Sequence, residues 1–314
     1  MRFDKESIIV DLELTTHCNA QCDFCPRDRF DTYGRMGFST FCKVVERIKA
    51  LNLDPVVNLC GIGGDPAMHP DLVKFVDYAA GKGLNIRLVT NGSRIDRKMA
   101  RELLDAGVAN VTFSINAIGD AYEQFYGLPF DLIVRNVEDF LEESNGRCRF
   151  EINLPQPKGH SGAFEEEKKF WKNLGVKHFL QLKYSNQVVN NAPEEAADLL
   201  KKYTEYKSAL KKMGCQILCP IPLKVISISY KGEYFLCEHD YTRSSILGNV
   251  FEQGIREIQL LKVDYMNARS TICQSCSVIN DLHEFSTRIE QGDDGLKAQL
   301  INLNDELAET IRVM

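Results

Sequence analysis

The chain has 314 residues, of which 44% are hydrophobic and 26% are charged, and its formal net charge is −6 at pH 7. This length suits a globular protein with one large domain and a smaller one. The negative charge argues against a nucleic-acid partner held through phosphate contacts. The absence of a run of about 18 apolar residues argues against a membrane-spanning helix.

The cysteine content and the N-terminal residues indicate the cellular compartment in which the protein is expected. There are 11 cysteines, and the charged N-terminal segment has no signal-peptide core. We therefore expect a cytoplasmic protein that binds neither nucleic acid nor membranes. Its thiols are expected to stay reduced and to serve metal binding or chemistry rather than disulfides.

Short strand patterns alternate with helical patterns through the first two-thirds of the chain. Strands are predicted at 8–15, 56–61, 85–90, 110–116, 148–154 and 178–184. Helices are predicted at 39–51, 70–82, 96–106, 131–143, 163–174 and 194–213. Because a strand and a helix alternate six times, the expected fold is α/β with a parallel sheet and right-handed crossovers.

The predicted strands alternate apolar and polar residues, whereas a parallel strand buried on both faces is usually apolar throughout. On 110–116, Val111 and Phe113 share one face while Thr112 and Ser114 share the other. The apolar face should lie under the helices, and the polar face should line a wet or ligand-filled space. A partial (β/α)6 barrel with a cavity satisfies both conditions; a flat sheet with one solvated face is the alternative.

Three cysteines follow the first predicted strand, namely Cys18, Cys22 and Cys25 in the spacing C-x3-C-x2-C. Three thiolates on one loop can hold three irons of a cubane and leave the fourth iron open to a small molecule. A zinc knuckle is the alternative, although it lacks a nearby fourth ligand unless His17 serves. The spacing, with the aromatic Phe24 before the third cysteine, resembles that of the radical S-adenosylmethionine (SAM) superfamily.

Two later loops resemble the same family. Gly63, Gly64 and Asp65, followed by proline, resemble its G-G-E-P loop with aspartate in place of glutamate. The resemblance implies that this loop holds the SAM amino group. Asn91, in a Thr-Asn-Gly turn after the third strand, matches another recurrent feature, although a simple strand-to-helix turn explains it equally well.

Polar residues on the fourth and fifth predicted strands complete the expected SAM site. Ser114 and Asn116 occupy positions where the family places groups on the SAM carboxylate and ribose, and Asn153 lies at a similar depth. The adenine is expected near Phe24. Further polar residues on the fifth and sixth strands are expected to hold a substrate through charge-assisted bonds. They are Arg149, Glu151, Gln181 and Lys183.

A second cysteine set lies in the last third of the chain. Cys219, Cys237, Cys273 and Cys276 surround a predicted hairpin of 224–230 and 233–237 and a helix near 253–262. Four cysteines can ligate every iron of a cubane, and a zinc site is the alternative. The spacing resembles the twitch form of the SPASM-type auxiliary domain, which implies a second [4Fe-4S] cluster.

The resemblance divides the chain into four parts. We expect a radical SAM partial-barrel core at 1–192, a linking helix at 193–214, a twitch auxiliary-cluster domain at 215–280 and a C-terminal helix at 281–314.

The resemblance also implies the chemistry. A flavodoxin- or ferredoxin-type donor reduces the first cluster, SAM is cleaved to a 5′-deoxyadenosyl radical, and this radical abstracts hydrogen from an sp3 C–H bond. The favoured outcome is oxidation of a hydroxyl-bearing carbon in a small aminosugar- or cyclitol-like molecule. In size and in the step of 18 residues from Cys219 to Cys237, the chain resembles twitch dehydrogenases of the butirosin-pathway type; the distance to the C-x2-C pair differs.

Three other outcomes stay open. An epimerase would use a cysteine as hydrogen-atom donor, either Cys215 beside the second set or Cys60 at the polar end of the second strand. A maturase would modify a ribosomal peptide, but the predicted core begins near residue 8, so no fused peptide-recognition domain is expected. A non-catalytic iron–sulfur electron carrier is the most remote, because it needs neither the glycine-rich loop nor a polar barrel interior.

Overall fold

A computed structural model describes residues 8–22, 25, 33–51, 53–60, 63–154, 164–180, 193–240, 243–268 and 271–314. In the described part of the chain the dominant element is one sheet with the strand order β6-β5-β4-β3-β2-β1-β7-β8-β9. Its first six strands are β1 (Ile9–Glu13), β2 (Val56–Cys60), β3 (Asn85–Thr90), β4 (Asn110–Ser114), β5 (Arg149–Asn153) and β6 (His178–Leu180).

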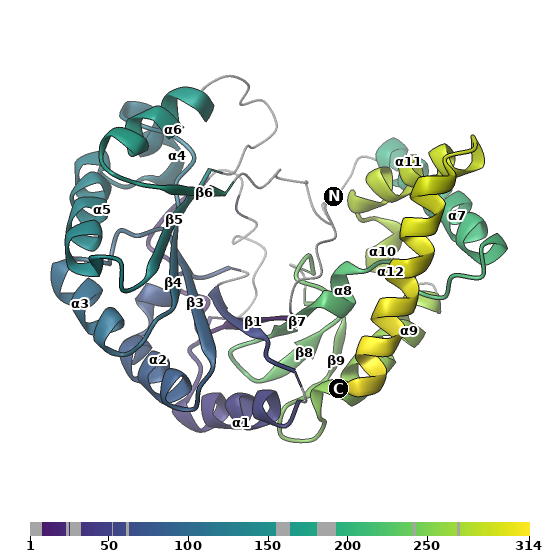
Figure 1. The fold of residues 1–314 in the computed structure, drawn as a ribbon, viewed down its shortest axis with the longest axis horizontal. Helices are drawn as coiled ribbons and strands as arrows, with labels where there is room; N and C mark the ends of the chain where they lie inside the picture. Colours follow the sequence, from purple (N-terminus) through teal and green to yellow (C-terminus); the bar gives the residue numbers. More distant parts are fainter. Residues whose placement is uncertain are drawn as a thin grey trace.

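These six strands are parallel to one another, and helices connect them. Figure 1 shows the sheet curving with the helices on its outer side. The helices of this half are α1 (Phe38–Lys49), α2 (Leu72–Gly81), α3 (Arg97–Asp105), α4 (Asp120–Tyr126), α5 (Phe130–Ser144) and α6 (Phe164–Asn173). The predicted α/β fold with a parallel, partly closed barrel is confirmed.

In the barrel half, two short elements were not predicted and β4 is shorter than predicted. The helix α4 and the 3-10 turn η2 (Pro66–Met68) were not predicted, because both are too short to show a helical period in the sequence. The strand predicted at 110–116 ends at Ser114, although the backbone N–H of Ile115 still donates to the carbonyl of Asn153 at 2.9 Å. Backbone pairing between β4 and β5 thus continues for one residue beyond the end of β4.

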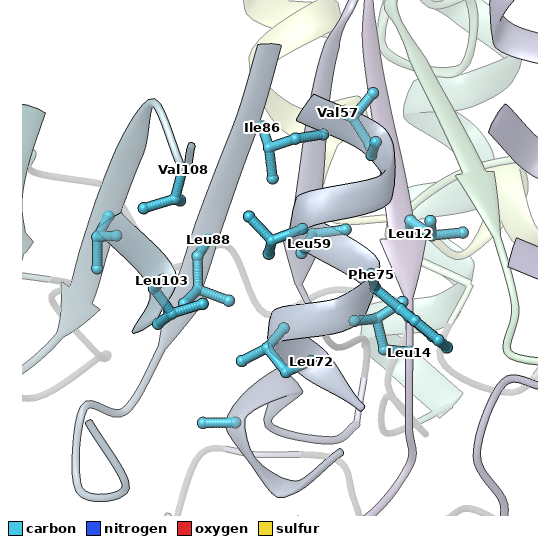
Figure 2. Close-up of a cluster of buried hydrophobic side chains, with 14 of the residues drawn as sticks. Leu12, Leu14, Val57, Leu59, Leu72, Phe75, Ile86, Leu88, Leu103 and Val108 are labelled. Atoms are coloured by element: carbon cyan, nitrogen blue, oxygen red, sulfur yellow. The ribbon is translucent and has the colours of Figure 1, made fainter. Parts of the chain in front are cut away.

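The apolar strand face is buried under the helices, as the alternation predicts. Figure 2 shows Leu59 of β2 and Leu88 of β3 packed against Leu72 and Phe75 of α2. The buried residues of α2 recur at helical spacing, which gives this helix one apolar stripe facing the sheet. Burial of this face holds the barrel wall in place and leaves the opposite face free for polar groups.

The polar strand face is internally bonded toward the amino ends of the strands. The carboxylate of Glu151 on β5 accepts from Arg87 of β3 at 3.0 Å, from Asn110 of β4 at 3.0 Å and from Thr112 of β4 at 3.1 Å. Glu151 is only 2% exposed, so these bonds replace the water that its charge would otherwise need. The deep interior of the barrel is therefore a polar ladder that joins three strands.

The C-terminal part adds strands to the same sheet. Strand β7 (Val225–Ile228) pairs in parallel with β1, and β8 (Glu233–Phe235) and β9 (Ile246–Asn249) follow antiparallel. The predicted hairpin is thus present, and its turn contains Gly232 at φ +80°. A Cβ atom there would lie 2.7 Å from Val250, so the close approach also favours glycine. The hairpin of the expected auxiliary region continues the barrel sheet rather than forming a sheet of its own.

A second buried cluster lies among the C-terminal helices, apart from the barrel core. It includes Tyr206, Leu223, Leu282 and Leu307. The helices are α7 (Pro193–Lys212), α8 (Ile221–Lys224), α9 (Ile255–Asn267), α10 (Thr271–Gln274), α11 (Val278–Glu290) and α12 (Asp294–Val313), grouped on one side in Figure 1. None of the helices in the described ranges is both long and apolar enough to cross a bilayer.

The expectation of one C-terminal helix over 281–314 is wrong. Two helices occupy this stretch, and the first of them already begins at Val278. The break falls at Gly292, whose φ of +103° ends α11. Asp293 then caps α12 by accepting from the N–H of Leu296 at 3.0 Å.

The loop after β2 lies directly on the chain that follows β1. A Cβ atom on Gly64 would be 1.9 Å from the carbonyl oxygen of Thr15, a separation that no side chain tolerates. The N–H of Asp65 donates to the carbonyl of His17 at 2.8 Å. Glycine is therefore required at 64 because two loop backbones touch there.

Replacing Gly64 by alanine tests this contact. Because the obstacle is backbone, Gly64→Ala should lower the free energy of unfolding by about 2 kcal/mol or more. Urea unfolding of the metal-free protein measures it. The control is Gly81→Ala on α2, where a Cβ meets nothing within 4 Å; it should leave stability unchanged or raise it by up to about 1 kcal/mol. Equal stability of the two variants would contradict the contact.

Candidate active site

The first cysteine loop lies at the carboxyl end of β1, the edge where parallel sheets bind ligands. Cys18, Cys22 and Cys25 are half-buried, and none of them is in a disulfide. The N–H of Cys25 donates to the carbonyl of Cys22 at 3.0 Å, and the N–H of Ala20 points at the Cys18 sulfur at 3.4 Å. Phe24 lies outside the described residues, so its expected place beside adenine stays a prediction.

The turn after β3 is bonded to this cysteine loop. The amide nitrogen of Asn91 donates to Asn19 Oδ1 at 3.1 Å and lies 3.8 Å from the sulfur of Cys18. Asn19 in turn donates to Ser93 Oγ at 2.9 Å. Asn91 is therefore a positioning residue for the cysteine loop, a role that its place in the sequence did not reveal.

The side chain of Asp65 joins the same loops. Its carboxylate accepts from the Thr90 hydroxyl at 2.8 Å, from the N–H of Asn91 at 2.6 Å and from the N–H of Ala67 at 2.8 Å. Burial raises the pKa of Asp65, and the bond from Asn91 is the main effect opposing this rise. The shorter aspartate thus faces the protein and fixes the loop backbone, which leaves the backbone of Gly63 and Gly64 as the part able to meet a ligand.

Two buried asparagines at the same edge lack partners. Asn116 is 2% exposed, and neither its amide nitrogen nor its amide oxygen has a hydrogen-bond partner. Asn153 is 7% exposed, and its Oδ1 is also unpartnered. Ser114 is half-buried and in register with Asn153. Buried polar atoms rarely stay unpaired in a protein, so these amides fit a polar ligand such as SAM.

The helix α4 closes the site on one side. The N–H of Gln21 in the cysteine loop donates to the carbonyl of Tyr126 at 2.8 Å. Tyr122 is fully buried beside Tyr126, with ring centroids 4.7 Å apart, and its hydroxyl has no partner. Sequence reasoning missed this helix and both tyrosines.

The expected substrate residues are not gathered at this edge. Arg149 begins β5, at the amino edge of the sheet, and its Nε donates to Glu151 at 3.2 Å. Glu151 is occupied by the polar ladder described above. Gln181 and Lys183 lie outside the described residues. The placement of Arg149 and Glu151 does not support substrate contact, because ligands bind at the opposite edge of a parallel sheet.

The two candidate hydrogen donors differ in surroundings. Cys60 ends β2 in register with Glu13, and burial, with the negative charges of Asp11 and Glu238, raises the pKa of its thiol well above the ordinary value. Cys215 follows α7, and the next residue, Gln216, donates to Asn304 of α12 at 3.1 Å. Cys60 is therefore a protonated thiol on the barrel wall, whereas Cys215 lies beside α12.

The second cysteine set lines one pocket. Cys219, Cys237, Cys273 and Cys276 converge from three segments on a hollow with about 470 Å³ of empty space. Most other lining residues are apolar, and they come from α7, α8, α10, α11 and the end of β8. They are Tyr203, Leu218, Ile221, Pro222, Leu236, His239, Ile272, Val278, Ile279 and Leu282.

The thiols of this pocket resist ionisation as they stand. Burial raises the pKa of Cys219 and of Cys237 strongly, and it raises that of Cys276 to about 11. Neighbouring thiolates repel one another and add to the effect. A bound cationic core removes both penalties, since metals bind the thiolate form. By the chemistry of its donors alone, this set of thiols suits either an iron–sulfur cluster or a zinc ion.

Single-ion geometry is not present in either cysteine set. Within the described ranges, no three His, Cys, Asp or Glu side chains converge closely enough to hold one metal ion. The thiolates of a cubane lie further apart than those around one ion, because each of them binds a different iron.

A buried ion pair beside the first site escaped sequence reasoning. Arg243 donates to Glu13 Oε1 at 2.7 Å and to Oε2 at 2.9 Å, and the N–H of Tyr230 adds a third contact at 3.4 Å. Burial raises the pKa of Glu13 to about 7, although Arg243 opposes the rise. Arg243 has a left-handed backbone at φ +53°. No spacing signal links residues 230 positions apart, so only the fold reveals the pair.

Comparison with known proteins points to one family. Residues 12–157 match the family model of the Radical SAM superfamily. The chain is 26% identical over 278 residues to the Fe-coproporphyrin III synthase of Methanosarcina barkeri, covering 84% of this chain and 65% of that protein. The chain spans less than two-thirds of the length of this and other curated relatives.

Two solved structures share the fold. BtrN in complex with AdoMet and 2-DOIA gives a TM-score of 0.55 at 17% identity, covering 87% of this chain and 94% of that one. The enzyme anSMEcpe with bound AdoMet and the Cp18Cys peptide gives 0.62 at 15% identity, covering 97% and 98%. At such identities the likeness concerns the fold alone. Over residues 12–157 the chain is thus similar to the radical SAM superfamily, and it shares the partial-barrel fold of these two structures.

Proposed function

We propose that the chain is a radical SAM enzyme that oxidises a hydroxyl-bearing carbon of a small polar molecule. In this proposal Cys18, Cys22 and Cys25 hold a [4Fe-4S] cluster, reduced by a flavodoxin- or ferredoxin-type donor. When bound, the cluster and SAM supply a 5′-deoxyadenosyl radical that abstracts hydrogen from an sp3 C–H bond. The observation that carries the proposal is the meeting of the cysteine loop with the loops of Asp65 and Asn91 at one sheet edge.

The chain's own residues bind and orient. Asp65 fixes the glycine-rich loop so that its backbone carbonyls can accept from the SAM ammonium. The unpartnered amide nitrogen of Asn116 can donate to its carboxylate, and the unpartnered Oδ1 of Asn153 can accept from a ribose hydroxyl. The buried ring of Tyr122 helps to exclude water beside the cysteine loop. Such exclusion protects a radical from side reactions.

The second cysteine set supports oxidation over the rival outcomes. A cluster held by all four cysteines has no open iron, so its useful property is to accept and pass electrons. Oxidation needs such an acceptor, because loss of a proton and an electron turns a carbinol radical into a ketone.

Epimerisation is the second candidate, and one observation favours it. Cys60 ends β2 on the barrel wall; burial raises the pKa of its thiol and that of the Cys215 thiol alike, so its position and not its ionisation distinguishes Cys60. Cys215 is a weaker donor candidate because its surroundings are those of α12. The named relatives and neighbours include a peptide-bound enzyme and a PqqA peptide cyclase, so modification of a peptide stays a third candidate.

Iron content tests the two cysteine sets. Replacing Cys18, Cys22 and Cys25 together by alanine should leave about half of the iron and sulfide of the reconstituted protein and abolish SAM cleavage. Metal analysis and chromatography of 5′-deoxyadenosine measure these quantities. Cys42→Ala, outside both sets, is the control and should retain both properties. Zinc at the second set, or full iron in the triple variant, would contradict the assignment.

SAM affinity tests the two asparagines. Asn116→Ala and Asn153→Ala should each weaken SAM binding about ten- to hundredfold, because each removes a hydrogen bond to a charged or polar ligand. Calorimetry on the reconstituted protein provides the measurement. Asn110→Ala is the matched control, since Asn110 starts the same strand as Ser114 and bonds Glu151 instead. Unchanged affinity in both test variants would place SAM elsewhere.

Product mass separates oxidation from epimerisation. With aminocyclitols and amino sugars as trial substrates in D2O, oxidation yields a product lighter by two hydrogen atoms and without solvent deuterium. Cys60→Ala and Cys215→Ala should both retain this activity, as should the structural control Cys148→Ala. A product one mass unit heavier than the substrate, because it carries one solvent deuteron on carbon, would support epimerisation instead if it is lost in Cys60→Ala but not in Cys148→Ala.

A further inference from the structure

A lysine lies fully buried behind the pocket of the second cysteine set. Lys262 on α9 is 0% exposed, and its Nζ donates to the carbonyl of Pro222 at 2.6 Å and to that of Val225 at 3.0 Å. Pro222 itself lines the pocket. The ammonium is thus one residue away from the space that the four cysteines surround.

The charge of Lys262 is not needed to satisfy these carbonyls. One turn earlier on α9, the neutral amide of Gln259 donates to the carbonyl of Leu223 at 2.7 Å in the same buried layer. An amide would therefore serve as a cap without the large cost of burying an ammonium. A buried charge is retained where an opposite charge compensates it.

No described carboxylate lies within ion-pair distance of Lys262. Burial lowers the pKa of Lys262 to about 7, and the charges that oppose this fall belong to Cys237, Glu238 and Asp11. Of these three residues only Cys237 lines the pocket, and its sulfur carries a charge only when a metal or a cluster binds it as the thiolate. Four thiolates around an iron–sulfur core carry net negative charge, and reduction adds one more.

We propose that Lys262 is the electrostatic partner of the cluster held by Cys219, Cys237, Cys273 and Cys276 and raises its reduction potential. This inference rests on the proposed function. A buried ammonium stabilises the more negative, reduced cluster more than the oxidised one, because little water screens the interaction. The cluster thereby becomes a better acceptor for the electron that a substrate radical releases.

The test uses the full chain carrying the triple alanine replacement of Cys18, Cys22 and Cys25, so that the second site alone holds a cluster. Its midpoint potential is measured by a redox titration followed by electron paramagnetic resonance. Lys262→Met should lower the potential by an amount equal to about a tenfold change in the one-electron equilibrium, or about 59 mV. Lys262→Arg should stay near the parent value.

The control is Lys98→Met, which removes the same charge from an exposed position on α3. An assembled cluster whose potential is the same in Lys262→Met and Lys98→Met would overturn the inference and leave the proposed cluster intact. Failure of the triple-alanine parent to bind iron and sulfide would overturn both.

Loss of the cluster in Lys262→Met would also test the proposal, through two further variants of Lys262. If Lys262→Met folds, by circular dichroism and melting temperature of the metal-free chain, but holds no cluster, Lys262→Arg and Lys262→Gln separate charge from volume. Retention in the arginine variant and loss in the glutamine variant supports the proposal. Loss in both, or retention in both with equal potentials, overturns it.

Discussion

The inner face of the parallel sheet carries polar side chains that bulk water does not freely solvate, and each of them needs a partner. At the amino end, Glu151 is bonded by three side chains from two other strands, β3 and β4. At the carboxyl end, Asp65 meets this need with the loop of Thr90 and Asn91. Where the described chain supplies no partner, as at Asn116, water or a ligand can supply one. Polar groups that are hydrogen-bonded within the protein form the barrel wall, and polar groups without a protein partner mark the candidate binding site.

Strand β1 connects the two cysteine sets. Its carboxyl end leads into the first cysteine loop, and β7, which precedes Cys237 in the hairpin, pairs along its free side. Asp11 accepts from Asn58 of β2 at 2.8 Å and carries a pKa raised to about 8 by burial and by the neighbouring Glu238. Glu13 accepts a hydrogen bond from Arg243, which follows Cys237 by six residues in the sequence. The acidic face of one strand is thus the physical link between the two candidate cluster sites.

Much of the fold could be predicted from the sequence because alternation and helix period are local signals. The six parallel strands and the partial barrel followed from them, as did the hairpin around Gly232. Contacts between distant residues could not be predicted in this way. The partners of Glu13, the ladder of Glu151 and the burial of Lys262 depend on how strands meet, and no spacing rule encodes that.

The same limit applies to the candidate site. The cysteines were assigned by their spacing, and Asn116 and Asn153 by their place on the strands together with the family resemblance. Arg149 was assigned to substrate by its charge and by its place on the polar strand face, but it begins β5 at the amino edge, opposite the edge where parallel sheets bind ligands. A period-two pattern tells which face a residue occupies but does not tell how far along the barrel axis a ligand reaches.

The parallel pairing of β1 with β7 has a consequence for synthesis on the ribosome. The first strand gains its second neighbour only after residues 225–228 have emerged, so one of its edges stays open during most of translation. Open edges invite pairing with other chains, and inward-pointing charges discourage it. Asp11 and Glu13 carry such charges on β1. Asp11 and Glu13, which link the two sites in the folded protein, therefore also disfavour pairing of β1 with other chains until β7 has been synthesised.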